Sequence, residues 1–174
     1  MKQIIFKMTN ALIVLWICKV FLLSLPYKFT LHPDTQHIFG TIGSWLRGVL
    51  GDSLGIWFMS YGSYAVGSVE LLTSLILLSP ALFWLLKKSK IIAYAPNSDL
   101  LLALGGVMAA AVMAGAVFFH LFTPLGIEVM HEGQSDNGSL FYAAVSIFVL
   151  GLFLATINLL QFNDCVNKGG AVTC

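Results

Sequence analysis

Four long apolar segments constrain this chain more than any other feature of its sequence. They cover residues 9–29, 57–86, 100–124 and 139–161. Each exceeds the roughly 18 consecutive apolar residues that identify a membrane-crossing helix. In lipid, helices satisfy all of their backbone hydrogen bonds internally, whereas open sheets do not. We therefore predict an all-α fold, in which residues 1–174 form a single transmembrane domain built as a four-helix bundle.

The composition agrees with a membrane protein and argues against other classes. Hydrophobic residues make up 58% of the 174 residues, and charged residues only 10%. Soluble domains carry roughly 25% charged residues. The apolar segments leave no room for a soluble catalytic domain. The net charge of +1, without a basic block, gives no sign of nucleic-acid binding. The partner that the composition predicts is a lipid bilayer.

The first segment has one alternative interpretation. It follows the basic start MKQIIFK, as the core of a secretory signal peptide does. However, Lys19 interrupts the segment, and no small-residue cleavage site follows it. We therefore expect a retained helix.

The basic residues of the connections predict the orientation. With a cytoplasmic N-terminus, only Lys28 and Arg47 lie outside, and the acidic connection IEVMHEGQSDNGS contains no Lys or Arg. Because basic residues concentrate on the cytoplasmic side, we predict a multi-pass protein with both termini in the cytoplasm. The lysines on that side are Lys2, Lys7, Lys87, Lys88, Lys90 and Lys168.

Residues 34–50 predict a short amphipathic interfacial helix between the first two spans. Apolar residues recur there at helical spacing, with Asp34 expected as the N-cap and Gly51 as the stop. The helix either lies on the outer membrane surface, with Trp45 at headgroup level, or packs over the mouth of the bundle. The apolar positions are Ile38, Ile42, Trp45, Leu46, Val49 and Leu50.

Small residues recur at helix-packing spacing in three spans, and Asn97 is expected to open the third span. Such residues let helix backbones approach closely in lipid, so they predict a compact bundle, a homodimer face, or both. They are Ser60, Ser63, Gly67 and Ser74 around Glu70, then Gly106, Ala110 and Ala114, and finally Ala144, Gly151 and Ala155.

Two charged residues lie near the middle of spans, where charge is costly and usually faces the bundle interior. Antiparallel spans place Lys19 and Glu70 at comparable depth, so a Lys19–Glu70 ion pair is the first hypothesis. Such a pair either fixes the helix register or provides a carboxylate that handles protons. Lys28 ends the first span, where its side chain can extend to the headgroups.

His120 lies about one turn before the end of the third span. A histidine at this depth either bonds a neighbouring helix or a carbonyl near Pro124, or serves as a hydrogen-bond donor or proton relay. We predict no metal site, because the outer candidates lack metal-binding spacing and come from two connections. These are His32, His37, Glu128, His131 and Glu132.

Four stretches resemble a known family when taken in order. They are FLLSLPYKFTLHPDTQHIFGTIG, YGSYAVGSVELLTSLILL, MAGAVFFHLFTPLGIEV and GSLFYAAVSIFVLG. Their signals are a Lys that ends span one (Lys28), a Gly-x-x-Glu in span two (Gly67 and Glu70), and a His that closes span three (His120). Together they resemble the DoxX-like family of small bacterial four-helix membrane proteins, in particular an uncharacterised subgroup. Family members often carry an Arg early in span one, where this chain has only Lys19, displaced toward mid-membrane.

The resemblance implies a location in the bacterial cytoplasmic (inner) membrane. For some relatives it also implies a role as membrane subunit of a quinone-linked oxidoreductase, including thiosulfate:quinone oxidoreductase. On this basis Lys19, Lys28, Glu70 and His120 form a candidate intramembrane polar cluster that binds quinone or lipid. We assign no catalytic residue and predict no cofactor within the chain, so a redox partner protein would supply electrons. The alternatives are a non-enzymatic scaffold or assembly factor and, less favoured with four spans, a small-solute permease.

Overall fold

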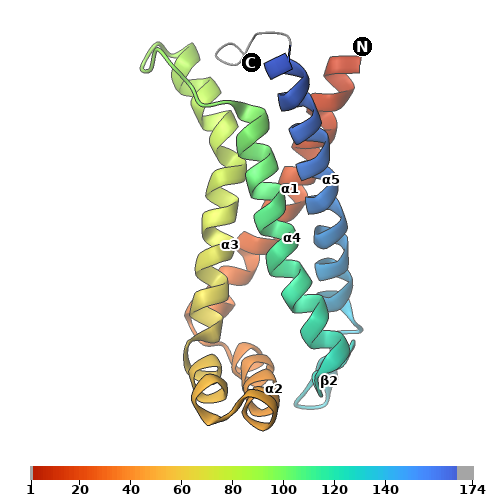
Figure 1. Cartoon of the computed structure of the whole chain (residues 1–174). Helices are drawn as coiled ribbons and strands as arrows, with labels where there is room; N and C mark the ends of the chain where they lie inside the picture. Colours follow the sequence, from red (N-terminus) through yellow and green to blue (C-terminus); the bar gives the residue numbers. More distant parts are fainter. Residues whose placement is uncertain (1, 168–174) are drawn as a thin grey trace.

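The computed structural model describes residues 2–167, and these residues form five α-helices and a two-stranded hairpin. Figure 1 shows α1, α3, α4 and α5 along the length of the molecule, with α2 and the hairpin together at one end, the α2 end. The elements are α1 (Lys2–Phe29), α2 (Pro33–Leu50), α3 (Asp52–Lys88), α4 (Ser98–Phe122), β1 (Met130–His131), β2 (Gln134–Ser135) and α5 (Ser139–Asn167).

The predicted all-α bundle with four spans is confirmed. Within the described residues, α1, α3, α4 and α5 are each long and apolar enough to cross a membrane. Most of these helices extend past the apolar segments by several residues, because helix geometry continues into polar flanking sequence. The start of α4 is also as predicted, since the Asn97 side chain accepts a hydrogen bond from the backbone N–H of Leu100 at 2.9 Å.

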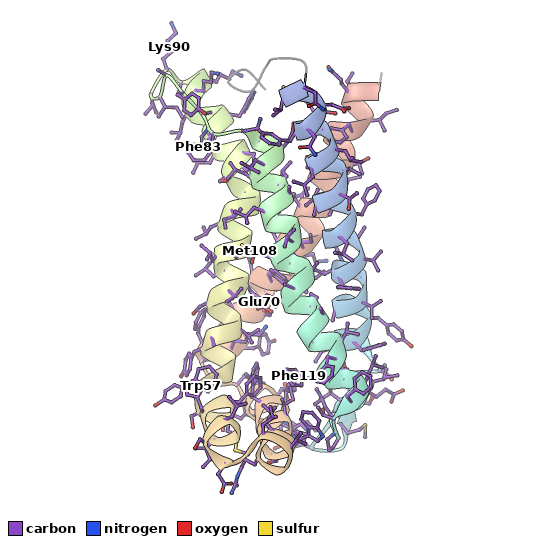
Figure 2. The ribbon with its side chains drawn as sticks, viewed as in Figure 1. Trp57, Glu70, Phe83, Lys90, Met108 and Phe119 are labelled. Atoms are coloured by element: carbon purple, nitrogen blue, oxygen red, sulfur yellow. The ribbon has the colours of Figure 1, made fainter. Side chains whose placement is uncertain are left out.

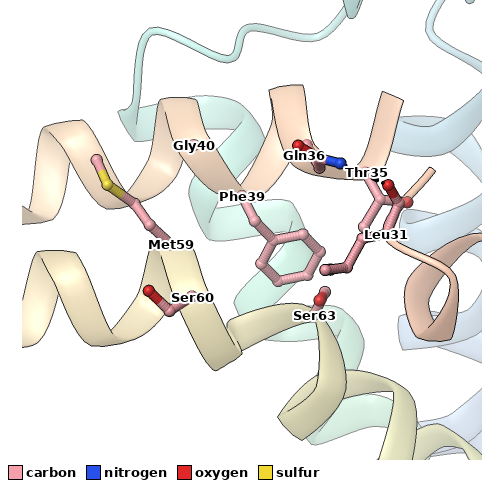
Figure 3. Close-up of a pocket in the computed structure, with 8 residues that line it drawn as sticks. All are labelled: Leu31, Thr35, Gln36, Phe39, Gly40, Met59, Ser60 and Ser63. Carbon is pink, nitrogen blue, oxygen red and sulfur yellow. Dashed lines mark hydrogen bonds between the residues drawn. The ribbon is translucent and has the colours of Figure 1, made fainter. Parts of the chain in front are cut away.

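α3 is longer than a bilayer requires. Its 37 residues span about 56 Å at 1.5 Å per residue, against roughly 30 Å for the hydrocarbon core. Figure 3 shows how the excess is used: the ribbon runs beside α2 through Met59 and then changes direction between Ser60 and Ser63. Gly62 lies in this bend, where glycine and serine commonly accompany helix kinks.

A close helix contact joins α4 and α5. A Cβ added to Gly106 would lie 2.7 Å from the carbonyl oxygen of Gly151, and one added to Gly151 would lie 2.8 Å from that of Gly106. These distances leave no room for a side chain at either position. The small residues thus pack the bundle internally, as predicted, with two exceptions: Ser60 and Ala114 are exposed.

α1 crosses the bundle diagonally, beside α5 at the end that holds the N-terminus and beside α3 near α2 (Figure 1). Apolar residues of α1, α3, α4 and α5 meet in one core around this crossing. Its buried members are Ile13, Val14, Ile17, Cys18, Phe21, Leu77, Ala109, Met113, Ala144, Ile147 and Leu154.

α2 packs over the end of the bundle, the second of its two predicted positions. Ile42 and Leu46 are buried against Leu125 and Val129 of the segment after α4. The other end of its apolar stripe does not contact the bundle, since Val49 and Leu50 are 58% and 61% exposed.

The predicted N-cap of α2 is wrong, whereas its stop is confirmed. His32 is the N-cap, and its ring nitrogen accepts from the backbone N–H of Asp34 at 3.4 Å. Pro33 takes the first helical position, a common place for proline, and this moves the cap two residues ahead of Asp34. Gly51 ends the helix with φ of 96°, a backbone angle that glycine adopts without a Cβ clash.

Candidate functional site

A buried ion pair joins α1 to α3 near the α2 end. Lys28 Nζ lies 2.7 Å from Glu70 Oε2, with side-chain exposures of 15% and 3%. The Ser24 hydroxyl lies 2.8 Å from the same carboxylate oxygen and 2.9 Å from Lys28 Nζ. Ser24 and Lys28 are four residues apart, so they share one face of α1. The charges are therefore paired and hydrogen-bonded, as groups at this depth must be.

A glycine of α3 contacts α1 beside the ion pair. Gly67 lies one turn before Glu70 on the buried face of α3, and a Cβ there would meet Lys28 at 3.4 Å. Ser63 and Ser74 continue the same face and are buried. The sequence prediction that this face of α3 points inward is thus correct for Ser63, Gly67, Glu70 and Ser74.

The hypothesis of a Lys19–Glu70 pair is wrong, because Glu70 bonds Lys28 instead. Lys19 is exposed, and its Nζ lies 5.7 Å from the centroid of the Trp16 ring. The expectation that Lys28 extends to the headgroups is wrong for the same reason. α1 crosses α3 at an angle, and the crossing brings its last turn, rather than its middle, to the depth of Glu70.

His120 is buried and satisfied by a backbone group. Its Nδ1 lies 2.7 Å from the carbonyl oxygen of Gly126, two residues past Pro124. Because a carbonyl only accepts, Nδ1 carries the proton in this contact. The ring also makes an edge contact with Phe141, at 5.7 Å between centroids. This matches the prediction of a histidine bonded to a carbonyl near the proline.

The structure does not bring His120 to the ion pair. Phe119, its neighbour, contacts Phe58 at 5.5 Å between ring centroids. Phe58 precedes Glu70 by 12 residues, which is about 18 Å along a helix. Figure 2 shows the same separation, with Phe119 close to α2 and Glu70 farther along α3. Of the four residues predicted as one cluster, only Lys28 and Glu70 meet.

A pocket of about 230 Å³ lies between α2 and the bend of α3. Figure 3 shows Phe39 and Leu31 on one side of it and Ser63 pointing into it from α3. The rim carries the polar side chains of Gln36 and Ser60. The complete lining is Leu31, Thr35, Gln36, Phe39, Gly40, Met59, Ser60 and Ser63.

The hydroxyl of Ser63 lacks a hydrogen-bond partner among the described residues. Ser63 is only 2% exposed, so water does not readily replace the missing partner. Thr73 and Ser74 of the same helix bond the carbonyl oxygens four residues before them, at 2.7 and 2.8 Å. A buried polar group without a partner is costly, so the Ser63 hydroxyl has an unused capacity to donate a hydrogen bond.

A second polar cluster ties α2 to the hairpin. The Nδ1–H of His131 donates to Asp34 Oδ1 at 2.7 Å, and His32 Nδ1 lies 3.2 Å from Asp34 Oδ2. The ring of His37 lies 4.8 Å from that of His131. Among the described residues, no group of three or more His, Cys, Asp or Glu has a geometry that holds a metal ion.

Asp136 organises the connection between the hairpin and α5. Its carboxylate accepts from the backbone N–H groups of Val129, Gly138 and Leu140, at 2.8 to 3.0 Å. Partial burial alone raises the pKa of this carboxyl. The hydrogen bonds from Leu140, Val129, Gly138 and the Ser139 hydroxyl outweigh burial and hold the pKa below its usual range.

Sequence reasoning missed a buried amide pair. Asn10 Nδ2 donates to Asn158 Oδ1 at 2.9 Å, and Asn158 Nδ2 donates back to Asn10 Oδ1 at 3.3 Å. Both residues are buried, and the pair joins α1 to α5. The available signal was an asparagine within each of two apolar segments, since polar residues there usually face another helix.

The chain matches no family model, no curated protein and no solved structure. Its helices identify the class of protein: a small multi-pass α-helical membrane protein in contact with lipid. They do not indicate an activity.

Proposed function

We propose that the protein is a DoxX-like subunit of the bacterial cytoplasmic membrane that binds the polar head of a quinone or lipid in the pocket between α2 and α3. The resemblance of its four spans to that family supports a role in a quinone-linked redox system. The chain has no recognisable redox cofactor site, so electrons come from a partner protein. This chain acts as an accessory subunit, and no residue is assigned a catalytic role.

One observation carries the proposal: the Ser63 hydroxyl is buried, unpaired and directed into a pocket with apolar walls. A quinone or a lipid ester has the matching chemistry, a carbonyl acceptor attached to an apolar body. A Ser63 hydrogen bond would fix the carbonyl while Leu31, Phe39 and Met59 contact the apolar part. This site replaces the predicted one, since neither Glu70 nor His120 lines the pocket.

The position of the buried Lys28–Glu70 ion pair also supports a function at the α2 end of the bundle. Glu70 follows Ser63 by seven residues, which is about 10 Å along α3. Lys28 and Glu70 fix α1 against α3 there, and Leu31 of the pocket follows Lys28 by three residues. The ion pair is therefore a positioning device for the pocket wall.

The distribution of basic residues supports the orientation. Lys87, Lys88 and Lys90 lie at the end of the molecule that holds the N-terminus, opposite Arg47 of α2 (Figures 1 and 2). By the positive-inside rule we infer that this end is cytoplasmic and that the pocket opens at the outer leaflet. Lys168, which also entered this prediction, lies outside the described residues.

Native mass spectrometry of the purified protein tests the binding. The probes are a short-chain ubiquinone analogue and dioleoylphosphatidylglycerol, each titrated separately. We expect Ser63→Ala to weaken binding of the true ligand about fivefold, since a hydrogen bond contributes about 1 kcal/mol. Ser63→Leu fills the pocket and abolishes binding. Ser68→Ala, at an exposed serine of α3 that does not line the pocket, is the matched control and binds as the wild type does.

Equal binding by all four proteins, or no binding of either probe, would refute the pocket. The non-enzymatic scaffold would then be the better function. The separate packing of Glu70 and His120 favours that alternative, because no single cavity joins them.

A further inference from the structure

Lys19 is an exposed charge in the middle of a membrane span. The span of α1 covers Gln3–Phe29, and Lys19 lies ten residues before its end. Ten residues correspond to about 15 Å of helix, which is half the thickness of a typical hydrocarbon core. The side chain is exposed, and among residues 2–167 its ammonium contacts the Trp16 ring.

None of the carboxylates among residues 2–167 forms an ion pair with this lysine. Snorkelling serves lysines near helix ends, and Lys19 is too far from either end of α1. The Trp16 ring attracts the ammonium at 5.7 Å, but a ring face replaces only part of the hydration that the ammonium loses. Charges inside membranes pair with other charges or face water, so Lys19 lacks the carboxylate that its position requires.

The surroundings of Lys19 form a surface suited to another helix. Leu12, Leu15, Trp16 and Leu23 share its side of α1 at spacings of three, four and seven residues, and they are 66%, 62%, 38% and 63% exposed. The face is therefore an apolar stripe with a single cation at its centre.

We propose that this face of α1 docks a transmembrane helix of another protein that carries a carboxylate at mid-membrane. The carboxylate pairs with Lys19, while the leucines pack against apolar side chains of the partner. This inference is independent of the ligand pocket, which lies between α2 and α3.

A second copy of this chain does not provide the carboxylate. Its one acidic residue in the middle of a span is Glu70, which is 2% exposed and bonded to Lys28. The remaining acidic residues lie at helix ends or in connections. They are Asp34, Asp52, Asp99, Glu128, Glu132, Asp136 and Asp164. The partner is therefore a different protein.

The test uses a defined probe in place of an unknown partner. Two polyleucine transmembrane peptides, one with a single central Glu and one with Gln, carry a fluorescence donor. The full-length protein carries the acceptor, and both are reconstituted in phosphatidylcholine vesicles. We expect the Glu peptide to associate at least tenfold more tightly with the wild type than the Gln peptide does.

Two variants separate the charge from the apolar face. Lys19→Met removes the advantage of the Glu peptide, whereas Lys7→Met, which changes an exposed lysine at the far end of the same helix, keeps it. Both variants unfold at the wild-type temperature, because neither lysine is buried. Equal binding of the two peptides by the wild type, or retention of the Glu advantage in Lys19→Met, would overturn the proposal. Fluorescence transfer between labelled copies that depends on Lys19 would also overturn it, in favour of self-association.

Discussion

Replacing Lys28 by Met is the most informative perturbation of the bundle. The change removes the ammonium 2.7 Å from Glu70 and leaves a carboxylate that is 3% exposed, with only the Ser24 hydroxyl as partner. Removing one member of a buried pair typically costs about 3 to 5 kcal/mol. We therefore expect Lys28→Met to lower the free energy of unfolding by about 3 kcal/mol.

A double-mutant cycle isolates the pair. Glu70→Gln keeps the shape and the Ser24 contact but leaves Lys28 with a neutral partner, at a cost of about 2 kcal/mol. The double variant Lys28→Met/Glu70→Gln has no buried charge, so we expect a loss of only about 2 kcal/mol. The two changes are then non-additive by about 3 kcal/mol.

Unfolding in mixed micelles, titrated with a denaturing detergent and followed by helical circular dichroism, measures all three variants. Lys19→Met is the matched control, because that lysine is exposed and lacks a carboxylate partner. Its effect should stay within about 0.5 kcal/mol. Additivity of the Lys28 and Glu70 changes within about 0.5 kcal/mol, or a larger effect from Lys19, would refute the reasoning.

Three further predictions address the rest of the bundle. Gly106→Ala forces a Cβ against the backbone of Gly151 and should cost about 1 to 3 kcal/mol, whereas Gly115→Ala, with open space around it, should be neutral; the same detergent titration compares them. His120→Leu leaves the Gly126 carbonyl without its partner and should cost about 1 to 3 kcal/mol, and a loss below 0.5 kcal/mol, an order-of-magnitude limit for surface changes, would contradict the burial of that contact. Asp136 has a lowered pKa, so its stabilisation is present above the ordinary aspartate pKa of about 3.9 and disappears as pH falls through the lower folded value. The protection factors of the hairpin amides, which compare each exchange rate with the intrinsic rate at the same pH, should therefore fall for the wild type as pH drops below the ordinary aspartate pKa of about 3.9. In Asp136→Asn they should be low already at pH 7, and equal protection in both proteins at pH 7 would contradict the prediction.

The spans were predictable because they depend on local composition alone. Twenty or more apolar residues in succession have few alternatives to a membrane helix, so the four segments became α1, α3, α4 and α5. Helix ends were predictable where one residue decides them, as at Gly51 and Asn97. The cap at His32 was missed, although Pro33 gave a usable signal, since proline favours the first helical position.

The polar contacts were less predictable because they depend on how helices cross. Equal depth was inferred for Lys19 and Glu70 by treating α1 and α3 as straight antiparallel helices. In the structure α1 runs diagonally and brings Lys28, rather than Lys19, to Glu70. Asn10 and Asn158 are 148 residues apart in the chain, and nothing local selects that pairing. The Ser63 pocket was also missed, because it results from the bend of α3 against α2.

The diagonal course of α1 has a consequence for biogenesis. Asn10 pairs with α5 and Lys28 pairs with α3, so α1, which is synthesised before α3 and α5, is inserted before either partner. Until α5 is inserted, the Asn10 amide lacks its hydrogen-bond partner in lipid, which costs free energy. Chains interrupted before α5 therefore keep the Asn10 amide exposed to lipid, where membrane quality-control proteases can recognise it. Pairing with Asn158 of α5 buries this amide.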